Sequence, residues 1–230
     1  MKEERLTRYH AHLDFTEPIL GSWPTEDYIL REHIQKKAGE ILNQEMVDEE
    51  LAALPADELK ERLQEMRTTV FPRDKGDGHI ILWNYQVLGF LKEMANDFKK
   101  AMGVTNFRWK IATYCIVDPR RFPLLRDGQP IMKPDDIFVR PLRRDSKMGP
   151  IVAISTSERL YPPLTLDFDL CCLHNQANWS ESLITEEMLR DLLDLGVFKG
   201  LGQWHSGGWG RFEYTLEQVG VNRTETAERC

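Results

Sequence analysis

The sequence lacks the features that would place it in a membrane or a secretory pathway. Its 230 residues contain no run of about 18 apolar side chains, the length that a membrane-spanning helix needs. The first ten residues, MKEERLTRYH, contain neither the apolar segment nor the cleavage signal of a secretory peptide. We therefore expect a soluble, cytoplasmic protein with no membrane partner.

Cysteine is scarce and is poorly spaced for cross-linking or for metal binding. The four cysteines are Cys115, the adjacent Cys171 and Cys172, and the terminal Cys230. This spacing is not that of a disulfide framework. Because no CxxC or HxxxH spacing accompanies them, the sequence predicts no metal site, and no motif in it indicates a cofactor or a small-molecule ligand.

Positive charge is also in short supply, since the formal net charge is -7. This balance argues against a protein that coats nucleic acid by bulk attraction, because affinity for phosphate depends on concentrated Lys and Arg. The distribution is uneven: residues 1–100 hold 14 basic and 20 acidic side chains, whereas residues 108–147 hold 10 basic and 5 acidic ones. The middle segment is either a solvated hairpin or a surface that meets an anionic partner.

The first half of the chain has mainly helical patterning. Residues 9–15 alternate polar and apolar side chains as a half-buried strand does. A helix is expected from Thr25, which has N-cap chemistry, and two short helices are expected at 48–66, broken by a proline. Residues 81–103 predict a short apolar strand or turn that leads into a long helix ending at Gly103.

From Phe107 onward the pattern changes to that of strands. A single helix interrupts it, with Thr185 as its cap and Gly196 as its end. The expected strands share alternating or apolar residues between prolines and glycines, and they lie at 107–118, 131–143, 149–156, 164–174 and 211–219.

This order of elements predicts an α+β fold with an antiparallel sheet. A ferredoxin-like (RRM-like) domain fits it best, enlarged by a helical insertion at about 45–78 and a β-hairpin insertion at about 118–148. Residues 1–220 then form a single domain, and residues 221–230 form a flexible tail.

The segment 200–214, GLGQWHSGGWGRFEY, concentrates five glycines and two tryptophans. Glycines allow backbone positions with positive φ, and successive unpaired N–H groups form a nest that binds phosphate. Trp204 and Trp209 offer flat faces on which bases could stack. The alternative is structural, since glycines also serve tight turns and tryptophans often cover a sheet edge. No Walker loop is present, so ATP chemistry has no support.

The residues K-G-L-G-Q-W-H-S-G-G-W-G-R-F-E (199–213), which follow the helix TEEMLRDLLDLG, resemble the C-terminal glycine-rich signature of the RAMP superfamily, the RNA-binding proteins of CRISPR effector complexes. Weaker matches are IILWNYQVLGFLKEM (80–94), HLDFTEPILGS (12–22) and PLTLDFDLCCL (163–173). The resemblance implies a ferredoxin-like fold, a guide-like single-stranded RNA as ligand, and protein subunits as neighbours. It does not imply catalysis.

The first hypothesis is therefore a non-catalytic RNA-binding protein within a ribonucleoprotein complex. The second is an interaction protein of phage or mobile-element origin that keeps the fold and binds a protein complex. The third is a metal-independent endoribonuclease, for which His33 and His205 are the candidate catalytic residues, because histidine exchanges protons near neutral pH. The candidate RNA-binding residues are Lys199, Gly200, Gly202, Gln203, Trp204, His205, Ser206, Gly207, Gly208, Trp209 and Arg211, together with Arg120, Arg121, Arg143 and Arg144 of the basic segment.

Overall fold

The computed structural model describes residues 6–24, 68–103, 105–146, 149–174 and 183–219 of the chain. Several predictions fall outside the described residues. These are the helix from Thr25, the two short helices at 48–66, most of the helical insertion at 45–78, and the tail at 221–230.

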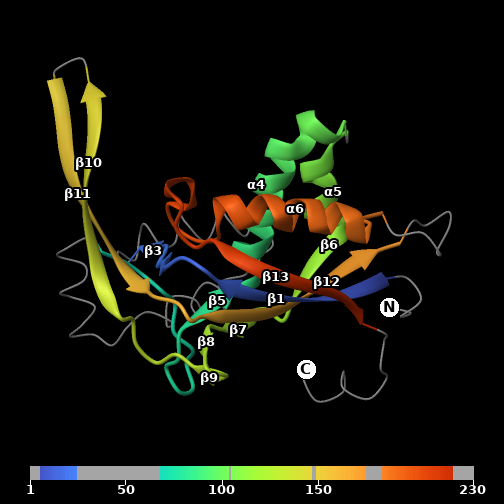
Figure 1. The fold of residues 1–230 in the computed structure, drawn as a ribbon, viewed down its shortest axis with the longest axis horizontal. Coiled ribbons are helices and arrows are strands. Elements are labelled where there is room, and N and C mark those ends of the chain that lie inside the picture. The colour runs from blue at the N-terminus through green and yellow to red at the C-terminus, as the bar shows by residue number, and fades with distance from the viewer. Residues whose placement is uncertain (1–5, 25–67, 104, 147–148, 175–182, 220–230) are drawn as a thin grey trace.

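The larger sheet is built around β1, Leu6–Phe15 (Figure 1). β1 pairs antiparallel with β12, Thr165–Leu173, on one side and with β13, Phe212–Val219, on the other. β6, Cys115–Asp118, pairs antiparallel with the far side of β12. The strands predicted at 9–15, 164–174 and 211–219 are thus neighbours in one antiparallel sheet.

β1 buries every second side chain from Tyr9 onward. Tyr9, Ala11, Leu13 and Phe15 are all 5% exposed or less, while the residues between them are half-buried or exposed. Because side chains alternate across a strand, one face of the sheet belongs to the core and the other faces solvent. We call the second face the open sheet face.

Three α-helices lie on the core face of this sheet among the described residues (Figure 1). They are α4, Asn84–Met102, α5, Phe107–Tyr114, and α6, Glu186–Lys199. α4 ends at Gly103 in the left-handed conformation, and α6 begins at Thr185, whose hydroxyl accepts a hydrogen bond from the Met188 amide. Both helix boundaries agree with the sequence prediction. No helix in the described part of the chain is long and apolar enough to cross a bilayer.

A second sheet contains the long hairpin that projects from the body of the molecule. β10, Asp136–Ser146, and β11, Gly149–Leu160, form a long hairpin that projects from the body (Figure 1). The base of β11 pairs with two short segments that share its sheet, namely β2, Ile19–Leu20, and β4, Thr68–Val70, and β4 pairs with β3, Trp23–Pro24. The long hairpin at 136–160 extends beyond the insertion expected at 118–148.

The rest of that expected insertion folds against the body as short strands. β5, Ile81–Trp83, pairs with β7, Arg121–Pro123. β8, Leu125–Arg126, joins β12 and pairs with β9, Gln129–Pro130. The described residues therefore form a mixed α/β structure in which every strand pairing is antiparallel except that of β11 with β4.

Two predictions of local structure are wrong. Residues 107–114, expected as strand, form α5, because Phe107 and Ile111 are four residues apart and both are fully buried against the core. Gly196 does not end its helix, since α6 continues to Lys199 and Gly200 is the C-cap. A Cβ at Gly196 would meet the Phe90 ring and would lie 2.7 Å from Cζ of Phe212, so the glycine serves close packing inside the helix.

Candidate nucleic-acid interface

The glycine segment forms a closed bend between α6 and β13. Its two ends lie in contact, because the Leu201 amide donates to the Gly210 carbonyl at 2.8 Å. The Gly210 amide donates in turn to the carbonyl of Pro18, which lies outside the segment, at 2.8 Å. Gly200 and Gly210 both have positive φ, at 82° and 67°, and a Cβ at Gly200 would lie 2.7 Å from the Gly210 carbonyl carbon. Glycine is needed here because two backbone segments touch. We call residues 200–211 the glycine bend.

The bend uses much of its own hydrogen-bonding capacity. Besides Leu201 and Gly210, the amides of Gly200, Gly207 and Gly208 donate to carbonyls of Gly196, Trp204 and His205. These five N–H groups cannot serve the anion nest that the glycine content predicted. An anionic ligand at the bend would have to meet side chains.

Both tryptophans of the bend pack against the projecting hairpin. The Trp209 ring lies 4.6 Å from the ring of Phe138 on β10, the Trp204 ring lies 6.3 Å from it, and the two indoles are stacked at 6.1 Å. Trp204 remains 37% exposed. The three rings, which we call the aromatic cluster, join the bend to the hairpin and leave one indole within reach of a ligand.

Arg140 lies directly on this cluster. Its guanidinium carbon is 3.4 Å from the centre of the Trp204 ring, a cation–π contact. Partial burial lowers the pKa of Arg140 from its ordinary value. Within the described residues no carboxylate pairs with Arg140, whereas Arg126 and Arg159 each hold an aspartate. Arg140 is thus a partly desolvated cation, held by an aromatic ring, whose charge is available to an anion.

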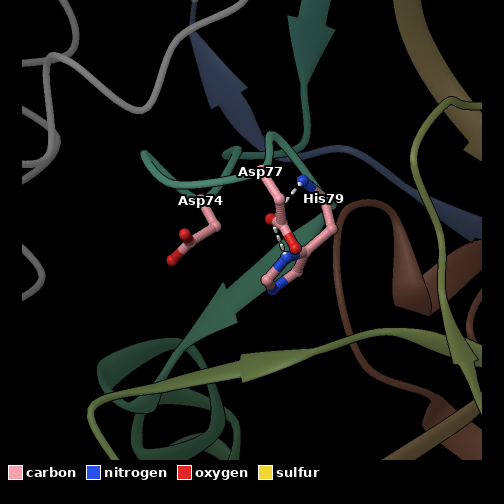
Figure 2. A group of neighbouring side chains, drawn as sticks. All are labelled: Asp74, Asp77 and His79. Carbon is pink, nitrogen blue, oxygen red and sulfur yellow. Dashed lines mark hydrogen bonds and ion pairs between the residues drawn. The ribbon is translucent and has the colours of Figure 1, made fainter.

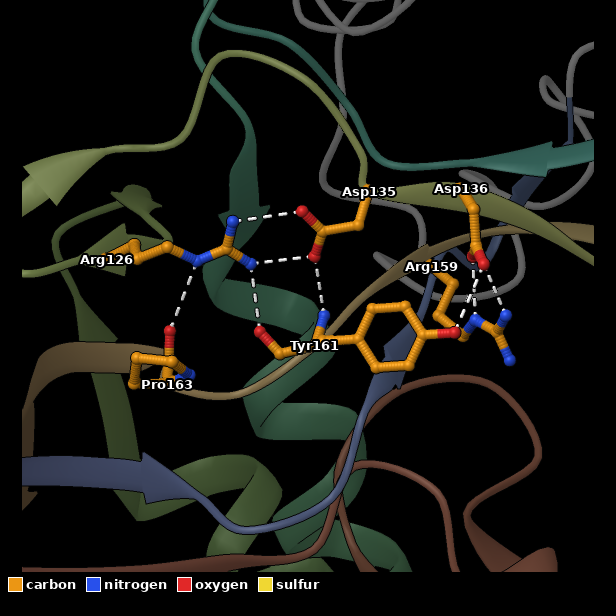
Figure 3. Close-up of polar contacts among 6 residues, drawn as sticks. All are labelled: Arg126, Asp135, Asp136, Arg159, Tyr161 and Pro163. Carbon is orange, nitrogen blue, oxygen red and sulfur yellow. Dashed lines mark hydrogen bonds and ion pairs between the residues drawn. The ribbon is translucent and has the colours of Figure 1, made fainter.

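A polar network fixes the root of the hairpin (Figure 3). Arg126 donates to both carboxylate oxygens of Asp135, at 2.9 and 2.7 Å, and to the Tyr161 carbonyl at 2.9 Å. Arg159 pairs with Asp136, which also accepts a hydrogen bond from the Tyr161 hydroxyl at 3.1 Å. The hydrogen bonds from Arg126 and Arg159 lower the pKa values of Asp135 and Asp136 respectively. The hairpin therefore leaves the body in a defined direction.

Three polar residues of the predicted site already have partners in the chain. Lys199 pairs with Asp97. The Gln203 side-chain oxygen accepts hydrogen bonds from the hydroxyls of Thr69 and Ser157, at 2.6 and 3.0 Å. Nε2 of His205 lies 3.3 Å from a carboxylate oxygen of Glu93. These three contacts anchor the bend, whereas Ser206, Gly207 and Arg211 are exposed.

The predicted arginines of the basic segment do not gather at the bend as a group. Arg120 and Arg121 lie over the ring of the buried Trp83, at 5.1 and 6.0 Å, and Arg121 is 3.3 Å from Asp74. Arg143 and Arg144 occupy β10 opposite Val152 and Ile151, but their side chains lie outside the described residues. His33 also lies outside them.

The open sheet face carries a ladder of histidines and aspartates. The sequence places His10 and His12 on one face of their strand, but it does not reveal their aspartate partners. Nδ1 of His10 is 2.9 Å from Asp169, and Nδ1 of His12 is 2.7 Å from Asp167. The hydrogen bond that the His12 ring donates to Asp167, helped by the nearby charges of Asp167 and Asp14, raises the pKa of His12 against a smaller opposing effect of burial. These pairs join β1 to β12 across the sheet, so only the strand register could reveal them.

Replacing Asp167 by asparagine should lower the pKa of His12 toward 6.5, because its largest stabilising partner is lost. In the unchanged protein, the stability that protonated His12 contributes is complete below pH 6.5 and is lost as the pH rises through the raised pKa. An NMR titration of the His12 ring proton measures this pKa, and urea unfolding at several pH values measures the stability that depends on it. Asp169→Asn, at the partner of His10, should leave the titration of His12 nearly unchanged, and an unaltered pKa in Asp167→Asn would contradict the assignment.

One loop gathers three potential metal ligands (Figure 2). Ligand atoms of Asp74, Asp77 and His79 all lie within 4.8 Å of one another. Asp77 accepts hydrogen bonds from the backbone amide and ring of His79, which lower its pKa, while Asp74 lies 3.3 Å from Arg121. The spacing D-x-x-D-x-H could have drawn attention to this loop. In the structure Asp77 contacts the His79 ring and Asp74 lies beside Arg121, and the absence of a metal site stays a prediction.

Comparison with known proteins gives only distant likenesses. No family model matches the chain, and no curated protein matches it. Among solved structures, a subunit of a type III-B Cmr-beta complex bound to cognate target RNA matches 94% of this chain at 11% identity with a TM-score of 0.42. A subunit of a type IV-B CRISPR complex matches 94% of the chain at 10% identity with a TM-score of 0.43. The matches cover 61% and 92% of those chains, so the protein spans less than two thirds of the first. Similarity at this level assigns neither topology nor activity.

Proposed function

We propose that the chain is a non-catalytic RNA-binding protein of RAMP type that acts within a CRISPR-like ribonucleoprotein complex. The observation that carries the proposal is the Arg140 guanidinium, which lies on the half-exposed Trp204 ring without a carboxylate partner among the described residues. A flat ring beside an unpaired guanidinium suits single-stranded RNA, whose bases stack on aromatic rings and whose phosphates accept hydrogen bonds from arginine. The exposed Arg211 of the bend adds a second cation.

The proposal includes a ferredoxin-like core. The elements β1, α4, β6, β12, α6 and β13 occur in the order β-α-β-β-α-β, with β2 to β5, α5 and β7 to β11 inserted between them. The antiparallel strand order β13, β1, β12, β6 is consistent with that arrangement. In this view the projecting hairpin and the glycine bend are additions at one end of the sheet.

The open sheet face is not the RNA site that we propose. Strand register brings two rows of carboxylates and histidines together there, because Asp169 lies opposite both His10 and Asp118. Six acidic residues share this face with Arg8, and they would repel a phosphate backbone. They are Asp14, Asp118, Asp167, Asp169, Glu213 and Glu217.

The same acidic face supports a second candidate function, that of an interaction protein with a basic protein partner. A partner that stays bound after nuclease treatment and is released by Asp169→Asn, but not by Trp204→Ala, would favour it. The endoribonuclease hypothesis stays a prediction, since Nε2 of His205 lies 3.3 Å from Glu93 and His33 lies outside the described residues.

At low salt the purified chain is expected to retard a single-stranded RNA in a native gel. Affinity should fall steadily with rising salt, because phosphate contacts release bound cations from the RNA. The absorbance ratio at 260 and 280 nm of the freshly purified protein provides a second check, since a co-purified RNA raises it. No retardation at low salt, where phosphate contacts are strongest, would overturn the proposed function.

A further inference from the structure

A small cavity opens beside the glycine bend. Its volume is about 130 Å³, and it lies between α4 and the bend. Gly89 and Glu93 line it from α4, while Gly202 and His205 line it from the bend. His205, which lines the cavity, directly follows Trp204 of the aromatic cluster in the chain.

Gly89 is the informative residue of this cavity. It lies well inside α4, where glycine is the poorest helix former after proline, and its φ is not in the left-handed region. A Cβ built at Gly89 would meet nothing within 4 Å, in contrast to Gly196 of α6, whose Cβ would collide with two rings. Neither backbone conformation nor packing explains Gly89. Because Gly89 has no side chain, the space beside it remains part of the cavity.

The cavity has apolar walls, which suit the faces of a planar ring, and polar groups, which suit the ring's hydrogen-bonding edge. Leu82, Phe90 and Leu201 supply apolar surface. At the polar side, Gln86 accepts a hydrogen bond from the Trp83 amide at 2.8 Å and donates one to the Ser22 hydroxyl at 3.0 Å. Since Ser22 Oγ accepts this bond and no acceptor for its proton is present among the described residues, the Ser22 hydroxyl can donate to a ligand.

The carboxylate of Glu93 adds an acceptor on the same wall, where its side chain is 51% exposed. The cavity is much smaller than the roughly 300 to 1,000 Å³ of drug-sized ligand sites. It therefore has room for one ring of a larger molecule and not for a complete nucleotide.

We propose that this cavity receives one base of the bound RNA strand, splayed out beside the bend. The identification of the ring as an RNA base rests on the proposed function, whereas the presence of a ring site rests on the cavity and Gly89. Because Glu93 accepts hydrogen bonds, bases that carry an exocyclic amino group are preferred over uracil.

Gly89→Leu tests the cavity, because leucine is a good helix former that fills the space. The probes are adenosine, guanosine, cytidine and uridine, added singly to the full chain and followed by saturation-transfer NMR. At least one amino-bearing nucleoside should bind the unchanged protein at millimolar concentration, with at least tenfold weaker binding to Gly89→Leu.

Gly89→Ala should raise the melting temperature by about 2 to 4 °C, since the helix gains a better residue and no contact is lost. Asn96→Leu, an exposed position two turns further along α4, is the matched control and should bind the nucleosides normally.

The outcomes separate this inference from the proposed function. If RNA is retarded but no nucleoside binds, or Gly89→Leu binds as well as the unchanged protein, the base cavity is wrong and the proposed function stands. If a nucleoside binds and is lost in Gly89→Leu while no RNA is retarded, the ring site is supported and the proposed function fails. Loss of nucleoside binding in Gly89→Leu together with a reduced preference for amino-bearing homopolymers supports the whole inference.

Discussion

Replacing Trp204 by alanine is expected to raise the dissociation constant for single-stranded RNA by about tenfold, since stacking of one base on an aromatic ring contributes about 1 to 3 kcal/mol. The same change removes the ring on which Arg140 lies at 3.4 Å, so it disturbs the cation as well. Arg140→Ala should weaken binding across all RNA sequences and reduce the slope of the salt dependence by about one phosphate contact. Fluorescence anisotropy of a labelled RNA, measured over a series of salt concentrations, gives both quantities.

Arg108→Ala provides the matched control for these variants. Arg108 is exposed on α5, which lies away from the hairpin (Figure 1), and its loss removes the same formal charge. If Arg108→Ala weakened binding as much as Arg140→Ala, the attraction would depend on overall charge and not on the aromatic cluster. Unchanged affinity in Trp204→Ala would contradict the stacking role directly.

Replacing Arg73 by methionine should lower the free energy of unfolding by about 3 to 5 kcal/mol at neutral pH, because it leaves a buried carboxylate unpaired. Glu158 is 1% exposed, and Arg73 donates to both of its oxygens, at 2.8 and 3.0 Å. The Phe71 amide also donates to Glu158, at 2.8 Å. This buried pair ties the base of β11 to the loop after β4, so its loss should also loosen the root of the hairpin.

The pH dependence of Arg73→Met follows from the direction of the Glu158 shift. Burial raises the pKa of Glu158, and the Arg73 charge and the Phe71 amide oppose that rise, so the variant should raise this pKa further. The stability that protonated Glu158 contributes is therefore fully present below about pH 4.5, the ordinary pKa of this carboxyl. It is lost as the pH rises through the raised pKa. Urea unfolding at several pH values should show a steeper loss in the variant than in the unchanged protein.

The double variant Arg73→Met with Glu158→Gln is the control for that experiment. Glutamine removes the buried charge and still accepts a hydrogen bond from the Phe71 amide, so much of the lost stability should return. A single variant within about 1 kcal/mol of the unchanged protein at neutral pH would show that Glu158 finds another partner or is neutral there.

Strand and helix positions in the second half of the chain were largely predictable, because burial on one face imposes a clear period. Alternation in residues 164–174 predicted β12, and the Thr185 cap predicted the start of α6. Alternation in residues 9–15, near the N-terminus, predicted β1 in the same way, but the sequence did not predict that β1 pairs with β12. The period failed at 107–114, where the sequence FRWKIATY also places Phe107 and Ile111 on one face of a helix. Packing against α4 favours the helix over the strand at these residues. A short stretch of sequence does not contain that tertiary contact, so its pattern alone could not predict the helix.

The candidate site was only half visible in the sequence. The glycine bend and its tryptophans were predictable from composition, but their partners on the hairpin were not, because Phe138 is more than sixty residues away from the bend. Alternation along β10 does place Phe138 and Arg140 on the same face, which was a usable signal. The predicted amide nest did not account for the bend's own hydrogen bonds, which depend on where its two ends meet.

Photochemical cross-linking of the chain to a 4-thiouridine RNA, followed by mass spectrometry, tests the central claim most directly. Cross-links should fall on Trp204 or its neighbours in the bend and on Phe138 in β10, where the account puts the bases. Cross-links confined to β1 and β12, on the open sheet face, would show that RNA binds elsewhere and would contradict the account.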